Sequence, residues 1–67
     1  MKAELLNYYR QINRPGKALS YCWPDMEEIG LGDPRVVLKL NQELIADGSI
    51  RVVRGRNMWA SDEYFLQ

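Results

Sequence analysis

Hydrophobic and polar positions recur with helical spacing in the first part of the chain. Leu5, Tyr9 and Ile12 follow one another at intervals of four and three residues, which places them on one face of a helix. The segment Asn13-Arg14-Pro15-Gly16 comes next, and proline followed by glycine is typical of a type II turn. We therefore predict a helix over residues 2–13, a turn, and a short extended stretch over residues 17–21.

Two further helices are indicated by their start and stop signals. Pro24 suits the first position of a short helix, and Gly30 can adopt the left-handed conformation that ends it, with Leu31 returning to the core. Asp33 followed by proline is a helix start, because the aspartate side chain can cap the free backbone N–H groups. These signals predict a third helix over residues 34–47, ended by Gly48.

The last part of the chain has the pattern of a β-hairpin. Residues 50–53 are mostly β-branched, and Gly55-Arg56 fits a two-residue turn with glycine first. This turn would pair Val53 with Met58 and Val52 with Trp59. We predict a hairpin over residues 50–60 and assign no role to a C-terminal tail over residues 61–67.

The same pattern predicts which side chains are buried. Asn41 interrupts the apolar face of the third helix, and we expect it, if buried, to form hydrogen bonds with the backbone. We expect Trp23 to be a core aromatic and Cys22 to be a small buried residue. The predicted core is Leu5, Leu6, Tyr9, Ile12, Leu19, Ile29, Val37, Leu40, Leu44, Ile50, Val52 and Trp59.

The order of elements resembles the winged helix-turn-helix superfamily. The resemblance is carried by residues 26–33 across the turn between the second and third helices, and by Leu44, Gly48 and Ile50 at the exit of the third helix. It implies an α+β fold with three helices and a C-terminal β-hairpin wing, in a domain over residues 1–60. It also implies DNA binding, with helix 34–47 in the major groove and hairpin 50–60 as the wing.

Composition excludes several classes of protein. The 67 residues include one cysteine and no histidine, so internal disulfides, the usual zinc sites and histidine-dependent nucleophilic catalysis are excluded. No apolar run reaches the roughly 18 to 20 residues that a membrane span needs, and residues 1–4 do not resemble a signal peptide. We therefore expect a cytoplasmic protein that is not an enzyme, with no metal, cofactor or small-molecule substrate.

Charge is unevenly distributed although nine basic and nine acidic residues balance overall. Residues 34–60 contain five basic and two acidic side chains, a net charge of +3. Arg35, Lys39 and Gln42 fall at i, i+4 and i+7 of the third helix, and these side chains can read base edges. Two arginines flank Gly55 at the predicted hairpin tip, where they can contact phosphates or a minor groove. The predicted DNA-binding residues are Arg35, Lys39, Gln42, Arg54, Arg56, Asn57, Lys17 and Arg51.

Two alternatives concern partners. A winged helix can also bind protein, and Leu38, Ile45, Val53 and Met58 would form an apolar surface for this purpose if they were exposed together. One small module offers limited contact with a duplex, so we expect a homodimer on a palindromic site. Residues 64–66 or the Leu6/Tyr8 side of the first helix are the candidate dimer surfaces.

Overall fold

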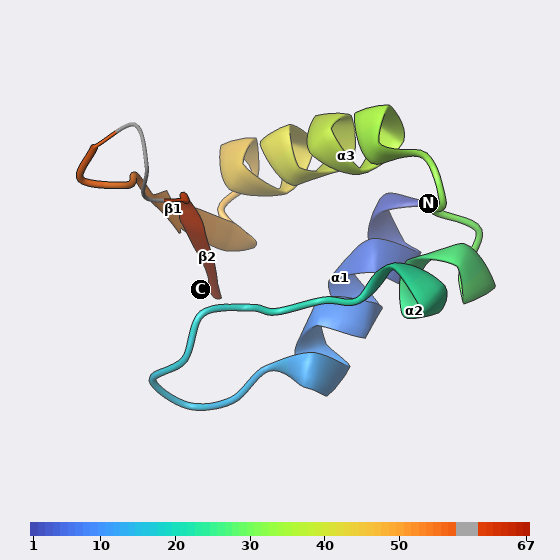
Figure 1. Ribbon diagram of the computed structural model, residues 1–67, viewed down its shortest axis with the longest axis horizontal. Coiled ribbons are helices and arrows are strands. Elements are labelled where there is room, and N and C mark those ends of the chain that lie inside the picture. The colour runs from blue at the N-terminus through green and yellow to red at the C-terminus, as the bar shows by residue number, and fades with distance from the viewer. Residues whose placement is uncertain (58–60) are drawn as a thin grey trace.

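The protein has three helices followed by a two-stranded antiparallel hairpin, the α+β architecture that the sequence predicts. The computed structural model describes residues 1–57 and 61–67 (Figure 1). The elements in chain order are α1 (Lys2–Ile12), α2 (Trp23–Glu28), α3 (Pro34–Ala46), β1 (Ile50–Val53) and β2 (Glu63–Leu66). No helix in this described part of the chain is both long enough and apolar enough to cross a bilayer.

The turn after α1 is the predicted one. Lys17 N–H donates to the carbonyl of Arg14 at 3.0 Å, and Gly16, the third residue of the turn, has φ +74°. Only glycine adopts that conformation without strain, so Pro15-Gly16 fixes a type II turn. Leu19 N–H then donates to the carbonyl of Tyr64 at 2.8 Å, which holds residues 17–21 beside β2 without making them a third strand.

The boundaries of α2 and α3 follow the local signals. Gly30 ends α2 with φ +82°, and Leu31 N–H donates to the carbonyl of Met26 at 2.8 Å, so Leu31 becomes buried as predicted. Asp33 caps α3, since its Oδ1 accepts a hydrogen bond from Arg35 N–H at 2.9 Å. Gly48, again with φ +82°, ends α3 and turns the chain into β1.

The predicted register of the hairpin is wrong. Val53 pairs with Glu63 and Val52 with Tyr64, so the loop between the strands covers residues 54–62 instead of two residues. Longer loops cost little, about 0.6 kcal/mol for each doubling of length, and this register packs Tyr64 and Leu66 against the core. Residues 61–67, predicted to be a C-terminal tail, therefore contain a strand.

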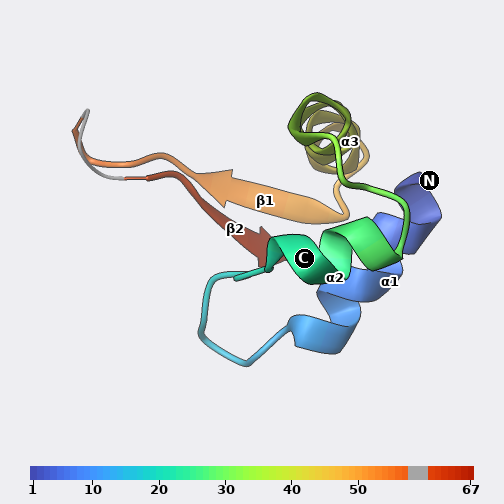
Figure 2. The same ribbon diagram turned by 45° about the vertical axis from the view of Figure 1, so that its right-hand side comes forward.

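α1 and α3 enclose most of the core, and β1 closes it at the C-terminal end of α3 (Figure 2). The buried apolar residues are Leu5, Tyr8, Tyr9, Met26, Leu31, Val37, Leu40, Leu44 and Ile50. Leu6, Ile12, Leu19 and Ile29, all predicted core residues, are partly buried against this cluster. Val52 is half-buried, and Trp59 lies outside the described residues.

Other burial predictions around α2 and α1 are wrong. Trp23 is exposed and packs edge-on against Tyr21, with ring centroids 5.6 Å apart, because Met26 takes the buried position of α2. Cys22 is also exposed, and its thiol donates to Asp25 Oδ2 at 3.0 Å. Tyr8 is buried, so it cannot serve as a dimer surface without rearrangement.

Candidate functional site

The outer face of α3 carries the predicted polar stripe. Arg35, Lys39 and Gln42 are all exposed, because the opposite face of the helix is committed to the core through Val37, Leu40 and Leu44. α3 forms one side of the molecule, with α1 behind it and the hairpin beyond its C-terminal end (Figure 1). The stripe is therefore accessible along the length of the helix.

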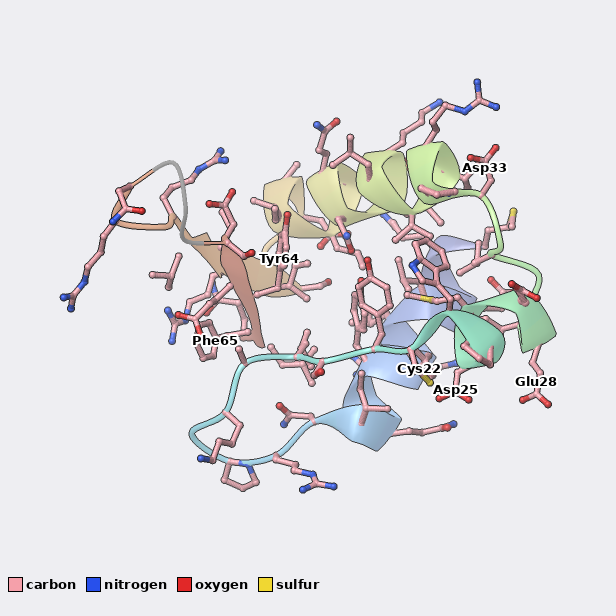
Figure 3. All side chains as sticks on the ribbon, viewed as in Figure 1. Cys22, Asp25, Glu28, Asp33, Tyr64 and Phe65 are labelled. Atoms are coloured by element: carbon pink, nitrogen blue, oxygen red, sulfur yellow. The ribbon has the colours of Figure 1, made fainter. Side chains whose placement is uncertain are left out.

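Arg35 is held only loosely in place. Its guanidinium lies 3.4 Å from both carboxylate oxygens of Asp33, and its side chain is 92% exposed. A long ion pair at such exposure contributes little, because water competes for both charges. Arg35 can thus leave Asp33 for another anion, while Asp33 stays bound to the backbone as the cap of α3 (Figure 3).

A polar contact inside the core, on the buried face of α3, helps to fix the orientation of this helix. Tyr9 of α1 donates its hydroxyl to Asn41 Oδ1 at 2.6 Å, and Asn41 is buried. Burial raises the pKa of Tyr9 and keeps the hydroxyl protonated as a donor. The prediction that Asn41 bonds to the backbone is wrong. The contact joins two side chains, from residues that are 32 positions apart in the sequence.

The hairpin loop is organised by an acid that the sequence analysis did not single out. Asp62 Oδ1 accepts from Gly55 N–H at 2.9 Å, and Oδ2 pairs with the Arg54 guanidinium at 3.0 Å. The Gly55 hydrogen bond, followed by the Arg54 contact, lowers the pKa of Asp62, which stays ionised at neutral pH. Arg56 and Asn57 are exposed, and Arg56 forms no ion pair within residues 1–57 and 61–67.

Two predicted contact residues lie away from the α3 face. Arg51 stacks over the ring of Phe65, 4.4 Å from its centroid, and Phe65 points to the other side of the sheet from Tyr64 (Figure 3). Lys17 ends the turn in segment 13–17, which lies past the C-terminal end of α1 and at the opposite edge of the molecule from α3 in both ribbon views (Figures 1 and 2). A duplex lying along α3 would not reach this segment.

The apolar alternative is only partly supported by exposure. Leu38 is 55% exposed and Val53 is 40% exposed, whereas Ile45 is partly buried against the core. Met58 lies outside the described residues. Leu38 borders the polar stripe on α3, so this helix presents both a polar and an apolar edge.

The structure brings together some of the predicted site residues and separates others. Arg35, Lys39 and Gln42 share one helix face, and Arg54, Arg56 and Asn57 share the hairpin loop. Asp62 is the residue that sequence reasoning missed. A signal for it existed in the apolar run 64–66, which has the composition of a strand and would have moved the loop boundary to Asp62.

Comparisons with known proteins identify no relative. No family model, curated protein sequence or solved structure matches this chain. Nor does the described part of the chain contain a group of three acidic or cysteine side chains arranged to hold a metal ion. Any functional assignment therefore rests on the geometry of the chain itself.

Proposed function

We propose that this protein is a small sequence-specific double-stranded DNA-binding protein of winged helix-turn-helix type, acting as a cytoplasmic transcriptional regulator. One observation carries the proposal: all three residues of the polar stripe of α3 are exposed, and a hairpin loop with two arginines extends past the end of the same helix (Figure 1). Helix and loop offer the two kinds of contact that duplex recognition requires, to base edges and to the backbone.

Each part of the stripe suits a particular contact. Arg35 can form a fork with guanine O6 and N7, and Gln42 can pair with the adenine edge. Lys39, between them, can reach guanine or a phosphate. The major groove is about 12 Å wide and admits one helix, so α3 would enter it with its exposed face towards the bases.

The hairpin loop would supply the contacts that do not depend on sequence. Arg56 is unpaired within the described residues and can contact a phosphate directly, whereas Arg54 must first exchange Asp62 for the phosphate. Single modules of this size bury only about 600 to 1,000 Å² on DNA. We therefore propose a homodimer on two half-sites, separated by about 34 Å, one turn of the duplex.

Binding to a preferred and a random duplex at several salt concentrations tests the proposal. Arg54→Ala with Arg56→Ala is expected to weaken binding to both duplexes alike and to lower the salt slope by up to about two. Arg35→Ala or Gln42→Ala should cost about 1 to 3 kcal/mol on the preferred duplex and much less on the random one.

Arg10→Ala is the matched control, because Arg10 is an exposed arginine on α1 rather than on α3 or the hairpin. It removes the same charge and should leave the preference for the selected duplex unchanged. If the wild type binds no duplex at about 50 mM salt, or if all four substitutions leave binding untouched, the DNA proposal fails.

A protein-binding function is the second candidate, and the exposure of Leu38 and Val53 favours it. Exposed apolar side chains that form one contiguous patch are the kind that a partner covers. Under this alternative, Leu38→Ser with Val53→Ser abolishes partner binding while Arg35→Ala and Arg56→Ala leave it intact. The DNA proposal predicts the reverse for duplex binding.

A further inference from the structure

A second basic region lies outside the α3 face. Residues 5–24 contain Arg10, Arg14 and Lys17 and no acidic residue, so this stretch of twenty residues carries a charge of +3. Segment 13–17 within it lies past the C-terminal end of α1, at the opposite edge of the molecule from α3 (Figures 1 and 2). These cations are therefore not part of the proposed DNA-binding surface.

The end of α1 and the segment after it line an open pocket of about 560 Å³. We call it the turn pocket, and its lining residues are Gln11, Ile12, Asn13, Arg14, Lys17, Ala18 and Ser20. Its volume falls within the range of about 300 to 1,000 Å³ that is usual for small-molecule sites. Ile12 is half-buried and Ala18 is partly covered, so apolar surface accompanies the polar groups.

The backbone that carries the two cations of the turn pocket is fixed. Arg14 and Lys17 are the first and last residues of the type II turn, which is fixed by the 3.0 Å hydrogen bond between them and by Gly16 at φ +74°. Within the described residues, neither side chain forms an ion pair. Two cations held on one turn without an internal counter-charge can both point donors at a single anion.

We propose that the turn pocket binds a small organic phosphate. Guanidinium and ammonium groups together match the oxygens of a phosphate, and the amides of Gln11 and Asn13 and the hydroxyl of Ser20 can bond an uncharged polar body. Ile12 and Ala18 offer contact to its apolar part. A concave site of this size suits a small molecule, whereas a duplex presents a convex surface. The site is separate from the proposed DNA-binding surface, and either can exist without the other.

The test uses adenosine monophosphate as the probe, with adenosine and inorganic phosphate as its two halves. Titration into the isotopically labelled protein at low salt is expected to shift the backbone amide signals of Gln11, Asn13 and Ser20. The nucleotide should bind at least about tenfold more tightly than adenosine, because the phosphate supplies the charge-assisted contacts. Inorganic phosphate should shift the same signals at higher concentration.

Arg14→Ala with Lys17→Ala should weaken nucleotide binding about tenfold or more, while Arg14→Lys should retain most of it. Arg10→Ala, which removes a nearby cation that does not line the pocket, should change the affinity less than about twofold. Circular dichroism checks that each variant is folded, and duplex affinity should be nearly the same in the double variant and the wild type. The proposal is overturned if the signal shifts map to α3 or the hairpin, or if no probe binds by about 10 mM. It is also overturned if adenosine binds as tightly as the nucleotide, or if Arg10→Ala weakens nucleotide binding as much as the double variant does.

Discussion

The two parts of the proposed DNA-binding surface each hold an arginine beside an aspartate, but the pairs differ in what the aspartate does. On α3, Asp33 caps the helix by accepting from Arg35 N–H at 2.9 Å, and it lies 3.4 Å from the Arg35 guanidinium. In the hairpin loop, Asp62 binds Arg54 at 3.0 Å and Gly55 N–H at 2.9 Å. Asp33 would keep its structural contact if Arg35 left, whereas the Arg54 contact is part of what shapes the loop.

The reason lies in what supports each region. A helix that is packed on a core projects its outer side chains without needing contacts among them, so Arg35, Lys39 and Gln42 remain available. A loop has no such support, and its own side chains must fix its path. In the hairpin loop, Arg54 is therefore paired with Asp62, whereas Arg56 forms no ion pair within the described residues and can contact an external anion.

The largest expected effect comes from weakening the support of α3. Asn41→Leu removes the acceptor of the buried Tyr9 hydroxyl and should lower the free energy of unfolding by about 1 to 3 kcal/mol. Urea denaturation measures this change. Adding Tyr9→Phe should restore most of the lost free energy of unfolding, because replacing both partners leaves no buried polar group without a hydrogen bond. If Asn41→Leu alone stabilises the protein, the side-chain contact does not support α3 as argued.

Asp33→Ala separates capping from ion pairing on α3. The loss of the cap should lower the free energy of unfolding by about 0.5 to 2 kcal/mol, measured by urea denaturation. Duplex affinity at a temperature where the variant is folded should not fall, because Arg35 loses only a weak partner. Asp33→Asn, which can still cap, is the matched control, and a loss of duplex affinity in both variants would contradict this view of Arg35.

Asp62→Asn addresses the hairpin in the same way. The amide oxygen can still accept from Gly55 N–H, but the charge that holds Arg54 is gone. Under the proposed function, random-duplex affinity should rise about twofold to fivefold at low salt, because one acid is removed and Arg54 is released. The same change in an Arg54→Ala background should raise affinity less. Equal gains in both backgrounds would mean that Arg54 is not restrained by Asp62.

The smallest effect is expected at the junction between α3 and the hairpin. Asp47 Oδ1 accepts from Ser49 N–H at 3.0 Å and Oδ2 pairs with Lys2 at 3.0 Å. Hydrogen bonding to the Ser49 side chain, then to Lys2 and to the Ser49 backbone, lowers the pKa of Asp47 to about 2. Because the folded pKa lies below the unfolded value near 3.8, ionised Asp47 stabilises the fold above that value. This contribution should disappear as the pH falls through about 2.

Comparing wild type and Asp47→Asn in urea at several pH values measures this junction. The wild type should be the more stable protein at neutral pH, and the difference should shrink below the unfolded pKa of the carboxyl group. A difference that does not change between neutral pH and pH values near the folded pKa would show that the charge of Asp47 is not involved. Lys2→Met, which removes only the exposed ion pair, should have a smaller effect than Asp47→Asn.

Local sequence signals specified the helices and where they end. Apolar spacing, Asp33 before proline, and the glycines at positions 30 and 48 are short-range signals whose physical effects act within one or two helical turns. The type II turn at Pro15-Gly16 was predictable for the same reason. The outer position of Arg35, Lys39 and Gln42 followed once the buried face of α3 was known.

Long-range contacts set the hairpin register, the partner of Asn41 and the surroundings of Lys17. β1 could have paired with the residues just after Gly55, but Tyr64 and Leu66 gain burial when β2 forms at residues 63–66. Asn41 meets Tyr9 across 32 residues of chain, and the segment that carries Lys17 is held beside β2 by the hydrogen bond from Leu19 N–H to the carbonyl of Tyr64. These contacts join residues that are distant in sequence, and their free energy depends on burial that local spacing does not reveal.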